Sequence, residues 1–181
     1  MIRFNPSFAA LVLAGAASLT ACAMPLSPTT FVGQGPEMRP ERFFLGETTS
    51  WGVLETSGGA PSRTIRVEGH GRMELDGTLV LDQTVRYADR KPDQREWRLH
   101  KTGPDLYEGT LTDASGPVRA EVSGNLFHLL YPLKAAPGGS MEQWMYLQDD
   151  GRTVLNVGTA RVLGVMVLRL SERITHVDAS R

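Results

Sequence analysis

The chain has 181 residues, with 19 basic and 20 acidic side chains and a formal net charge of −1. This balance leaves no basic surface of the kind that attracts nucleic acid, and the length suits one domain after removal of a leader. The single cysteine excludes an intramolecular disulfide, so an ordinary hydrophobic core must stabilise the fold.

The N-terminus predicts a lipoprotein signal peptide over residues 1–21. Arg3 precedes an uncharged apolar run, Phe8 to Leu19, which is too short for a permanent membrane helix. The run ends in Leu19-Thr20-Ala21-Cys22, where small residues suit the lipoprotein signal peptidase and the thiol would carry diacylglycerol. An ordinary secretory signal is the alternative, but the only cysteine lies where lipidation requires it. We therefore expect a lipid anchor on Cys22 and a mature chain of 160 residues with a net charge of about −2.

Residues 22–36 predict the lipidated cysteine and a flexible tether. Ala23 to Thr30 contains two prolines and no periodic pattern, which indicates an extended segment. The residue after the cysteine is Ala23 rather than Asp, and Asp there resembles an inner-membrane retention signal of Gram-negative bacteria. For such a host, we expect the protein on the periplasmic face of the outer membrane, with the membrane as its partner through the anchor.

Residues 37–178 predict one barrel domain, which begins with a short helix. Glu37 to Leu45 has Pro40 placed to open a helical turn, and Gly46 follows to end it. Phe43 and Phe44 give this helix an apolar end that must be buried.

From Thr48 onward the hydrophobic pattern has period two, interrupted by turn residues about every ten positions. Such short connections exclude parallel crossovers, and an open sheet of this size would leave two unpaired edges. The sequence therefore predicts an all-β fold, an antiparallel meander of about 8–10 strands closed into a barrel, with a two-sheet sandwich as the alternative. The expected strands are Ser50–Ser57, Arg63–Glu74, Thr78–Ala88, Glu96–Lys101, Leu106–Asp113, Pro117–Ser123, Leu126–Lys134, Met141–Gln148, Arg152–Ala160 and Gly164–Thr175.

Two of these strands are apolar on both faces, namely Leu126 to Leu133 and Trp144 to Leu147. A barrel strand with a solvated outer side should alternate, so the outer faces of these two must be covered. The helix with Phe43 and Phe44 is the expected cover. The membrane surface and another envelope protein are the alternatives.

No catalytic, metal or cofactor motif is found. The four histidines fall on four separate strands without metal-ligand spacing. Gly69-His70-Gly71 lacks the third glycine and the following helix of a nucleotide site, and Asp149-Asp150 before Gly151 is typical of a hairpin turn. No Gly-x-Ser-x-Gly nucleophile motif occurs.

Aromatic residues interleaved with polar ones are the main functional signal. In a barrel of this size, inward side chains either fill the interior or line one ligand cavity. Packing in the core is therefore the simplest reading of each aromatic residue. The functional reading is a pocket for an apolar ligand, with basic residues near its mouth to meet a carboxylate or phosphate. The candidate residues are Tyr87, Trp97, Tyr107, Trp144 and Tyr146, with Arg86, Arg98 and His128 near the mouth.

Several motifs resemble, in order, those of an uncharacterised family of proteobacterial lipoproteins known only as a domain of unknown function. The resemblance covers roughly Arg42 to Arg173 and implies a lipocalin-like barrel, without implying an activity. This chain departs from the family at Met141-Glu142-Gln143, where paired Asp is usual, and at Val157, where a basic residue is usual. A polar ligand site of the family would be altered here. The shared motifs are Phe43-Phe44-Leu45-Gly46, Gly77-Thr78-Leu79-x-Leu81-Asp82-Gln83-x-Val85-x-Tyr87, Arg95-x-Trp97, Trp144-Met145-Tyr146-Leu147 and Asn156.

Three functional hypotheses follow. The first is a protein that binds or carries a fatty acyl chain or a similar apolar ligand in the barrel. The second is a structural or assembly partner of another outer-membrane protein, which would use the strands that are apolar on both faces. The third is an enzyme acting on a lipid-like substrate, which would need an interior polar cluster such as His128 beside an inward carboxylate. Fold alone does not decide among them.

Overall fold

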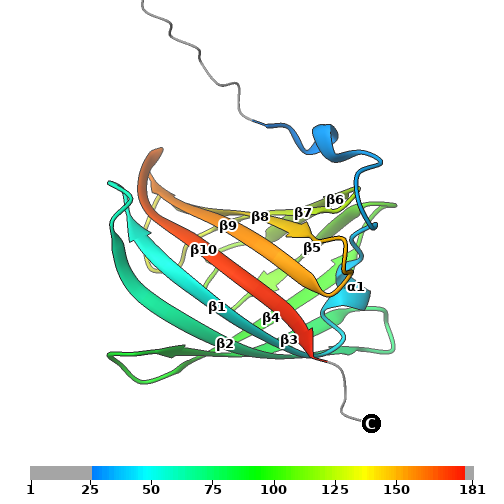
Figure 1. Cartoon of the computed structure of the whole chain (residues 1–181), viewed down its shortest axis with the longest axis horizontal. Helices are drawn as coiled ribbons and strands as arrows, with labels where there is room; N and C mark the ends of the chain where they lie inside the picture. Colours follow the sequence, from blue (N-terminus) through cyan, green and yellow to red (C-terminus); the bar gives the residue numbers. More distant parts are fainter. Residues whose placement is uncertain (1–25, 178–181) are drawn as a thin grey trace, which may run out of the picture.

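The computed structural model describes residues 26–177. Within them the chain forms ten strands and two short helical segments (Figure 1). The elements are η1 (Pro28–Phe31), α1 (Pro40–Phe43), β1 (Gly46–Thr56), β2 (Pro61–Met73), β3 (Leu79–Tyr87), β4 (Asp93–Lys101), β5 (Leu106–Leu111), β6 (Val118–Ser123), β7 (Leu126–Pro132), β8 (Gly139–Leu147), β9 (Thr153–Val162) and β10 (Val165–Val177).

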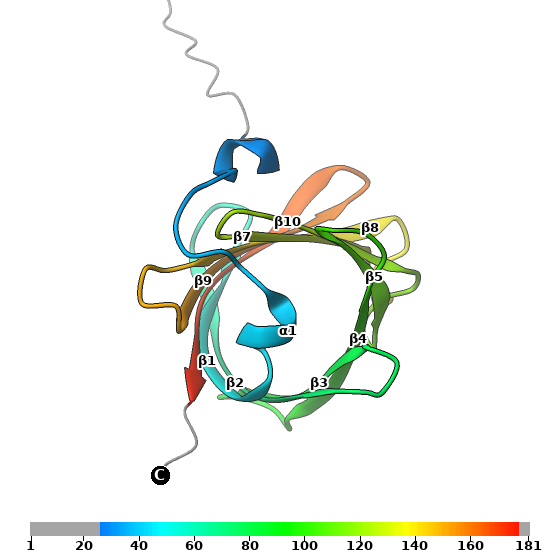
Figure 2. The same cartoon turned by 90° about the vertical axis from the view of Figure 1, so that its right-hand side faces the viewer.

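The ten strands form one closed antiparallel barrel, seen along its opening in Figure 2. Each strand pairs with its neighbours in the chain, and β1 closes the ring by pairing with β10. The predicted all-β meander and its closure are confirmed, and the sandwich alternative is excluded. All ten expected strands are present.

Side-chain alternation along the strands explains this architecture. On β2, Ile65 and Val67 are buried while Glu68 between Val67 and Gly69 is exposed. The register places Val67 opposite Val85 of β3, so the two side chains share the inner face. Gly77, in the turn between β2 and β3, has a φ of 84°, which favours glycine.

The short helix α1 closes one end of the barrel from inside, as Figure 2 shows. Pro40 opens it and Gly46, with a φ of 85°, ends it, as the sequence predicted, although the helix is shorter than expected. Phe43 and Phe44 are both only 5% exposed. Gly71 permits this plug, since a Cβ there would lie 1.6 Å from the Phe44 carbonyl oxygen.

The expectation that this helix covers the outside of the barrel is therefore wrong. The strand β1 begins at Gly46, directly after the helix, so Phe43 and Phe44 are held at the inner edge of the barrel. There they contact each other at 4.9 Å between ring centroids, and Phe44 lies 6.5 Å from Phe127. The concave interior removes more apolar surface from water than a convex outer face would.

The segment η1 covers the outside of β7 and β8 instead. The Phe31 ring lies 5.3 Å from the Tyr146 ring, and Leu126 is fully buried. The Met38 amide donates a hydrogen bond to the Gly124 carbonyl, at 2.8 Å. The 3-10 helix at Pro28–Phe31 thus lies within the segment expected to be an extended tether.

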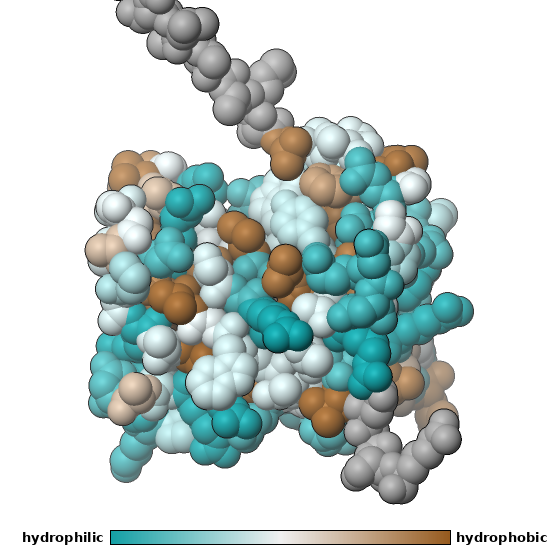
Figure 3. Space-filling view, viewed as in Figure 1, coloured by the Kyte–Doolittle hydropathy of each residue, from teal (hydrophilic) through white to brown (hydrophobic). Residues whose placement is uncertain are grey.

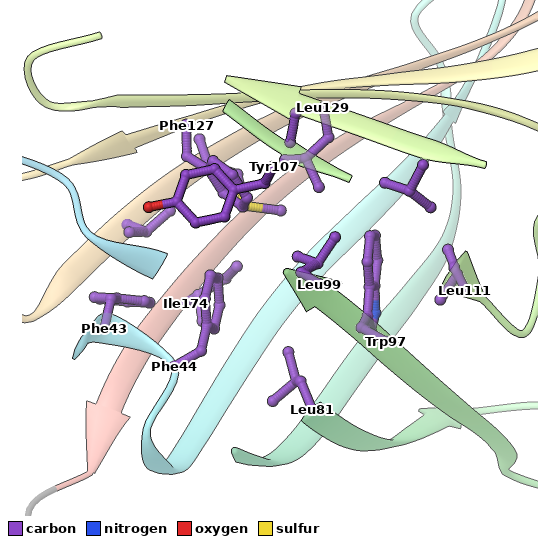
Figure 4. Close-up of a cluster of buried hydrophobic side chains, with 14 of the residues drawn as sticks. Phe43, Phe44, Leu81, Trp97, Leu99, Tyr107, Leu111, Phe127, Leu129 and Ile174 are labelled. Atoms are coloured by element: carbon purple, nitrogen blue, oxygen red, sulfur yellow. The ribbon is translucent and has the colours of Figure 1, made fainter. Parts of the chain in front are cut away.

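The hydrophobic core occupies the barrel interior along the length of the strands. Figure 4 shows Phe43 and Phe44 reaching into the same cluster as Tyr107 and Phe127. The outer surface in Figure 3 alternates between polar and apolar residues. Among the described residues, no helix is both long and apolar enough to span a bilayer.

Candidate binding cavity and its polar wall

A cavity of about 70 Å³ lies inside the barrel, bounded by the α1 plug on one side. Trp97 of β4 and Phe44 of the plug both line it. Most of its wall is apolar, and a group of polar side chains interrupts that wall. The apolar lining residues are Phe44, Ile65, Val67, Leu79, Leu81, Leu99, Phe127, Leu129, Met141, Met145, Leu170 and Ile174.

Polar residues from several strands meet on the inner surface. We call this group the interior polar cluster, and five of its members, Ser50, Tyr131, Gln143, Asn156 and Glu172, are joined by hydrogen bonds. Each occupies an inward position of its strand, with apolar inward residues before or after it. Those that line the cavity are Gln83, Arg95, Tyr131, Gln143 and Glu172, and Ser50 and Asn156 complete the cluster.

Asn156 joins two members of this cluster. Its amide nitrogen donates to Gln143 Oε1 at 2.8 Å and to Glu172 Oε2 at 3.0 Å. Gln143 Nε2 in turn donates to the Tyr131 hydroxyl at 3.2 Å, and Ser50 Oγ donates to the other oxygen of Glu172. The network therefore links five neighbouring strands, β1, β10, β9, β8 and β7, along the inner surface of the barrel.

One buried acceptor of the cluster has no donor among the described residues. Asn156 is only 1% exposed, and its Oδ1 atom has no hydrogen-bond partner. The Glu172 carboxylate requires a donor, so the amide nitrogen faces it and the orientation of the Asn156 side chain is fixed. A buried acceptor without a donor is costly, which makes Oδ1 a place where a ligand or water could donate.

The second part of the cluster lies around Trp97. Its indole nitrogen donates to Gln83 Oε1 at 2.8 Å, and its ring lies edge-on to Tyr131, 5.7 Å between centroids. Arg95 Nε lies 2.5 Å from Asp113 Oδ2, so this guanidinium is already paired with a carboxylate. Burial raises the pKa of the Tyr131 hydroxyl to about 12, which keeps it a neutral donor and acceptor.

Three of the candidate residues point inward. Trp97 lies in the cavity wall. Tyr107 is buried beside the plug, and its hydroxyl donates to Glu41 at 2.9 Å. Burial and this hydrogen bond both raise the pKa of Tyr107. Tyr87 is half-buried at the other end of the barrel, with the Arg90 guanidinium 3.8 Å from its ring centroid.

The other five candidates lie on the outer face, so their expected position around an interior pocket is wrong. His128 is neighboured in sequence by Phe127 and Leu129, which occupy the inward positions, so His128 points outward. On β8, Gln143, Met145 and Leu147 point inward. Trp144 and Tyr146 alternate with them in the sequence and therefore point outward. Arg86 and Arg98 pair on the outside with Glu68 and Glu74 respectively.

His128 belongs to an outer polar group rather than to the interior. Its Nδ1 lies 3.1 Å from Glu121 and its Nε2 lies 3.0 Å from Glu142, and its ring stacks on Trp144 at 4.3 Å. Burial acts to raise the pKa of Glu142, but hydrogen bonds from His128 and Arg161 outweigh it and hold that pKa below its ordinary value. The arrangement that the enzyme hypothesis required, His128 beside an inward carboxylate, is therefore not formed inside the barrel.

Sequence reasoning missed the interior polar cluster, although the strand pattern contained a signal for it. Gln143 lies in phase with the inward residues Met141 and Met145, and Glu172 lies in phase with Leu170 and Ile174. A polar residue at an inward position of a strand must find partners inside. The described residues contain no group of three or more His, Cys, Asp or Glu side chains suited to a metal ion.

Comparison with known structures shows similarity in fold. An S-type phycobiliprotein lyase, CPES of Guillardia theta, superposes with a TM-score of 0.61 at 9% identity, covering 79% of this chain and 95% of the lyase. A protein of unknown function from the DUF3598 family of Nostoc punctiforme gives 0.60 at 13% identity, covering 78% of this chain and 50% of that one. Rv2717c of M. tuberculosis gives 0.58 at 17% identity, covering 78% of this chain and 100% of that one. The lipocalin-like barrel is thereby confirmed, and identities this low establish nothing beyond the fold.

No curated protein matches the sequence significantly. A family described as "Protein of unknown function (DUF3833)" matches residues 16–175, which is most of the chain. The resemblance to a family of unknown function is thus confirmed at the level of sequence, and the chain belongs to the DUF3833 family.

Proposed function

We propose that the protein is a lipid-anchored envelope protein that binds a slender apolar ligand inside its barrel, with the ligand's polar group against the interior polar cluster. One observation carries the proposal: the apolar cavity has a single polar wall, which includes Gln143 and Glu172, and the buried Asn156 that bonds to both has an Oδ1 atom without a donor among the described residues. Apolar pockets with a few convergent polar groups are the usual form of small-molecule sites.

The order of residues along the strands gives the ligand a direction. On β3, moving away from α1, the inward residues are Leu79, Leu81 and then Gln83. On β4 the same direction passes Leu99, Trp97 and then Arg95, and on β7 it ends at Tyr131. Because α1 closes the other end, the apolar tail lies toward Phe44 and the polar group lies away from it.

The charges of the polar wall select the ligand's polar group. Arg95 is already paired with Asp113, and Glu172 brings a second carboxylate to the cavity. A carboxylate ligand would meet this excess of acidic groups without a free cation to compensate. A neutral group that donates a hydrogen bond, such as a hydroxyl, fits Glu172 in the cavity wall.

The cavity must enlarge to take such a ligand. Its volume of about 70 Å³ is below the roughly 300–1,000 Å³ of common ligand pockets. Met141 and Met145 line it, and methionine side chains adapt readily to irregular shapes because they have three rotatable bonds. Their movement provides room for a narrow chain without a change in the strands.

The anchor and location are part of the same proposal. The Leu19-Thr20-Ala21-Cys22 motif lies outside the described residues and inside the segment that matches the family, which begins at residue 16. Lipidation of Cys22 would place the barrel at the membrane, where apolar ligands are concentrated. With Ala23 following, we propose the periplasmic face of the outer membrane. Mass spectrometry of the mature N-terminus tests the anchor directly.

A fluorescence experiment tests the binding. The purified full-length lipoprotein in detergent is titrated with N-phenyl-1-naphthylamine, and the bound probe is displaced by monopalmitoylglycerol or by palmitate. We expect saturable binding and stronger competition by the neutral lipid. Leu129→Phe, in the cavity wall, should weaken probe binding by about tenfold, which corresponds to about 1.4 kcal/mol.

The adjacent residue supplies a matched control. Leu130 lies on the outer face of β7 and is 48% exposed, so Leu130→Phe makes the same chemical change outside the cavity. Probe binding should be unchanged in this variant. Equal binding by both variants, with both folded by circular dichroism, would refute an interior site.

A further inference from the structure

The turn that joins β9 to β10 is built at a conformational cost. Leu163 is the only non-glycine residue among those described with a positive φ, at 50°. Leucine is disfavoured there because its Cβ crowds the backbone, whereas Asn and Gly are common at such turns. Leu163 is also 83% exposed, so packing within the described barrel does not explain it.

The surroundings of this turn are also apolar. Val165, two residues later, is 67% exposed. The Leu163 amide donates to the Gly138 carbonyl at 3.1 Å, which ties the tip to the β7–β8 loop. That loop lies between Pro132 and Gly139 and contains Lys134 followed by Ala135, Ala136 and Pro137. The result is an apolar turn next to a loop that carries a lysine, a composition that suits the boundary between lipid headgroups and acyl chains.

A second apolar group lies on the same side of the barrel. Figures 1 and 2 both place the β9–β10 hairpin and η1, near the start of the described chain, on the same upper side of the barrel. The residues flanking η1 include Leu26, which is 58% exposed, and Val32, which is 72% exposed. Figure 3 shows apolar residues over the hairpin at the upper left. We call Leu26, Val32, Leu163 and Val165 the docking face.

The chain length limits what can lie opposite this face. Cys22 precedes Leu26 by four residues, which span at most about 14 Å when fully extended. A lipid on Cys22 therefore holds Leu26 close to the bilayer surface. A protein partner would have to fit within this narrow space, whereas the lipid surface is already present.

We propose that the docking face rests on the membrane, with the β9–β10 tip entering the headgroup boundary as a second contact beside the lipid anchor. The proposal rests on the anchor in the proposed function. It also gives the barrel an orientation. The docking face runs from η1, beside the β6–β7 turn at the α1 end, to the β9–β10 turn at the opposite end, so the barrel would lie on its side with its distal end also near the lipid.

The test measures the depth of single positions in vesicles. Leu163→Cys and Leu75→Cys are each labelled with a thiol-reactive nitrobenzoxadiazole dye in the full-length lipoprotein, reconstituted in phosphatidylethanolamine and phosphatidylglycerol vesicles. Leu75 is the matched control, because it is a fully exposed leucine in the β2–β3 turn at the α1 end. Lipids carrying a nitroxide on the acyl chain should quench the dye at 163 at least about twofold more than at 75.

Three results would overturn the proposal, and they are distinguishable. The parent protein has no other cysteine, so dye incorporation at Cys22 would show a free thiol and would refute the anchor together with the docking. A blocked Cys22 with equal quenching at both positions would refute the docking alone. In cells, a crosslink from position 163 to a protein rather than to lipid would assign the face to a partner protein and overturn the bilayer contact.

Discussion

The two ends of the barrel are made by the same ten strands but differ in how their interiors are filled. At the α1 end, Phe43 and Phe44 pack on Phe127 and Tyr107, and all four are at most 5% exposed. At the distal end, opposite α1, the inward Tyr87 is only half-buried and contacts Arg90. The first end is filled by packed aromatic rings, and the second is the end at which the proposed ligand would enter.

Two features at the distal end are unfavourable for the stability of the fold, which supports this division. Leu163 holds a disfavoured backbone conformation there, and Arg95 with Asp113 places an ion pair near the cavity. Features that cost stability concentrate at functional sites in folded proteins. The α1 end is closely packed instead. There the Phe44 carbonyl approaches residue 71 so closely that only glycine fits at this position.

The largest expected effect comes from removing the plug. Phe44→Ala should lower the free energy of unfolding by about 3–5 kcal/mol, because a buried aromatic ring is lost and a cavity remains. Urea unfolding followed by circular dichroism measures this. The same variant should bind N-phenyl-1-naphthylamine more tightly, since the cavity is enlarged toward α1.

The distal counterpart should respond less. Tyr87→Ala removes a half-buried ring and should cost clearly less than Phe44→Ala, about 1–2 kcal/mol. A larger loss from Tyr87→Ala than from Phe44→Ala would contradict the assignment of stability to the α1 end.

The interior polar cluster should show an intermediate effect. Asn156→Ala leaves Gln143 Oε1 and Glu172 Oε2 without their donor and should cost about 1–3 kcal/mol. Urea unfolding of this variant is compared with that of Thr84→Ala, which removes an exposed hydrogen bond to Gln94 on the outer face. A loss no greater than in the control would show that the network is not a stabilising element.

The raised pKa of Tyr131 predicts a loss of stability in alkaline solution. The hydroxyl has an ordinary pKa of 10.0 and about 12 in the folded protein, so between these values the folded state keeps a proton that the unfolded state releases. Stability from this group is complete below pH 10 and falls as the pH rises toward 12. Tyr131→Phe should reduce the fall in thermal midpoint across this window. Because the pKa of Tyr107 is also raised, part of the fall in thermal midpoint should remain in the Tyr131→Phe variant. An unchanged slope in the variant would contradict the prediction.

Much of the fold could be predicted from the sequence because its signals are local. Period-two alternation, Gly77 and Gly151 at turns, and Pro40 with Gly46 at the helix ends each depend on a few neighbouring residues. The position of the helix could not be predicted in this way. Whether Phe44 covers the outside of β7 or plugs the inside depends on contacts with Phe127 and Gly71, which are distant in sequence.

The site was less predictable for a related reason. The aromatic residues suggested a pocket, yet Trp144 and Tyr146 lie in the outward phase of β8. Met141 and Gln143, on the same strand, lie in the inward phase. Period-two phase, applied to polar residues as well as apolar ones, separates the two groups. The pairing of Gln143 with Asn156 and Glu172 still requires knowledge of which strands are neighbours.

The smallest expected effect has the opposite sign. Leu163→Asn should raise the free energy of unfolding by about 1 kcal/mol, because Asn tolerates a φ of 50° better than Leu and almost no burial is lost. Leu75→Asn, at an exposed turn position, should change it by less than about 0.5 kcal/mol. In the lipidated protein, the same Leu163→Asn change should reduce quenching by nitroxide lipids of a dye on Val165→Cys. A variant that is more stable and yet contacts the membrane less would show that the leucine is retained at the distal end for contact with lipid, because folding alone favours its replacement.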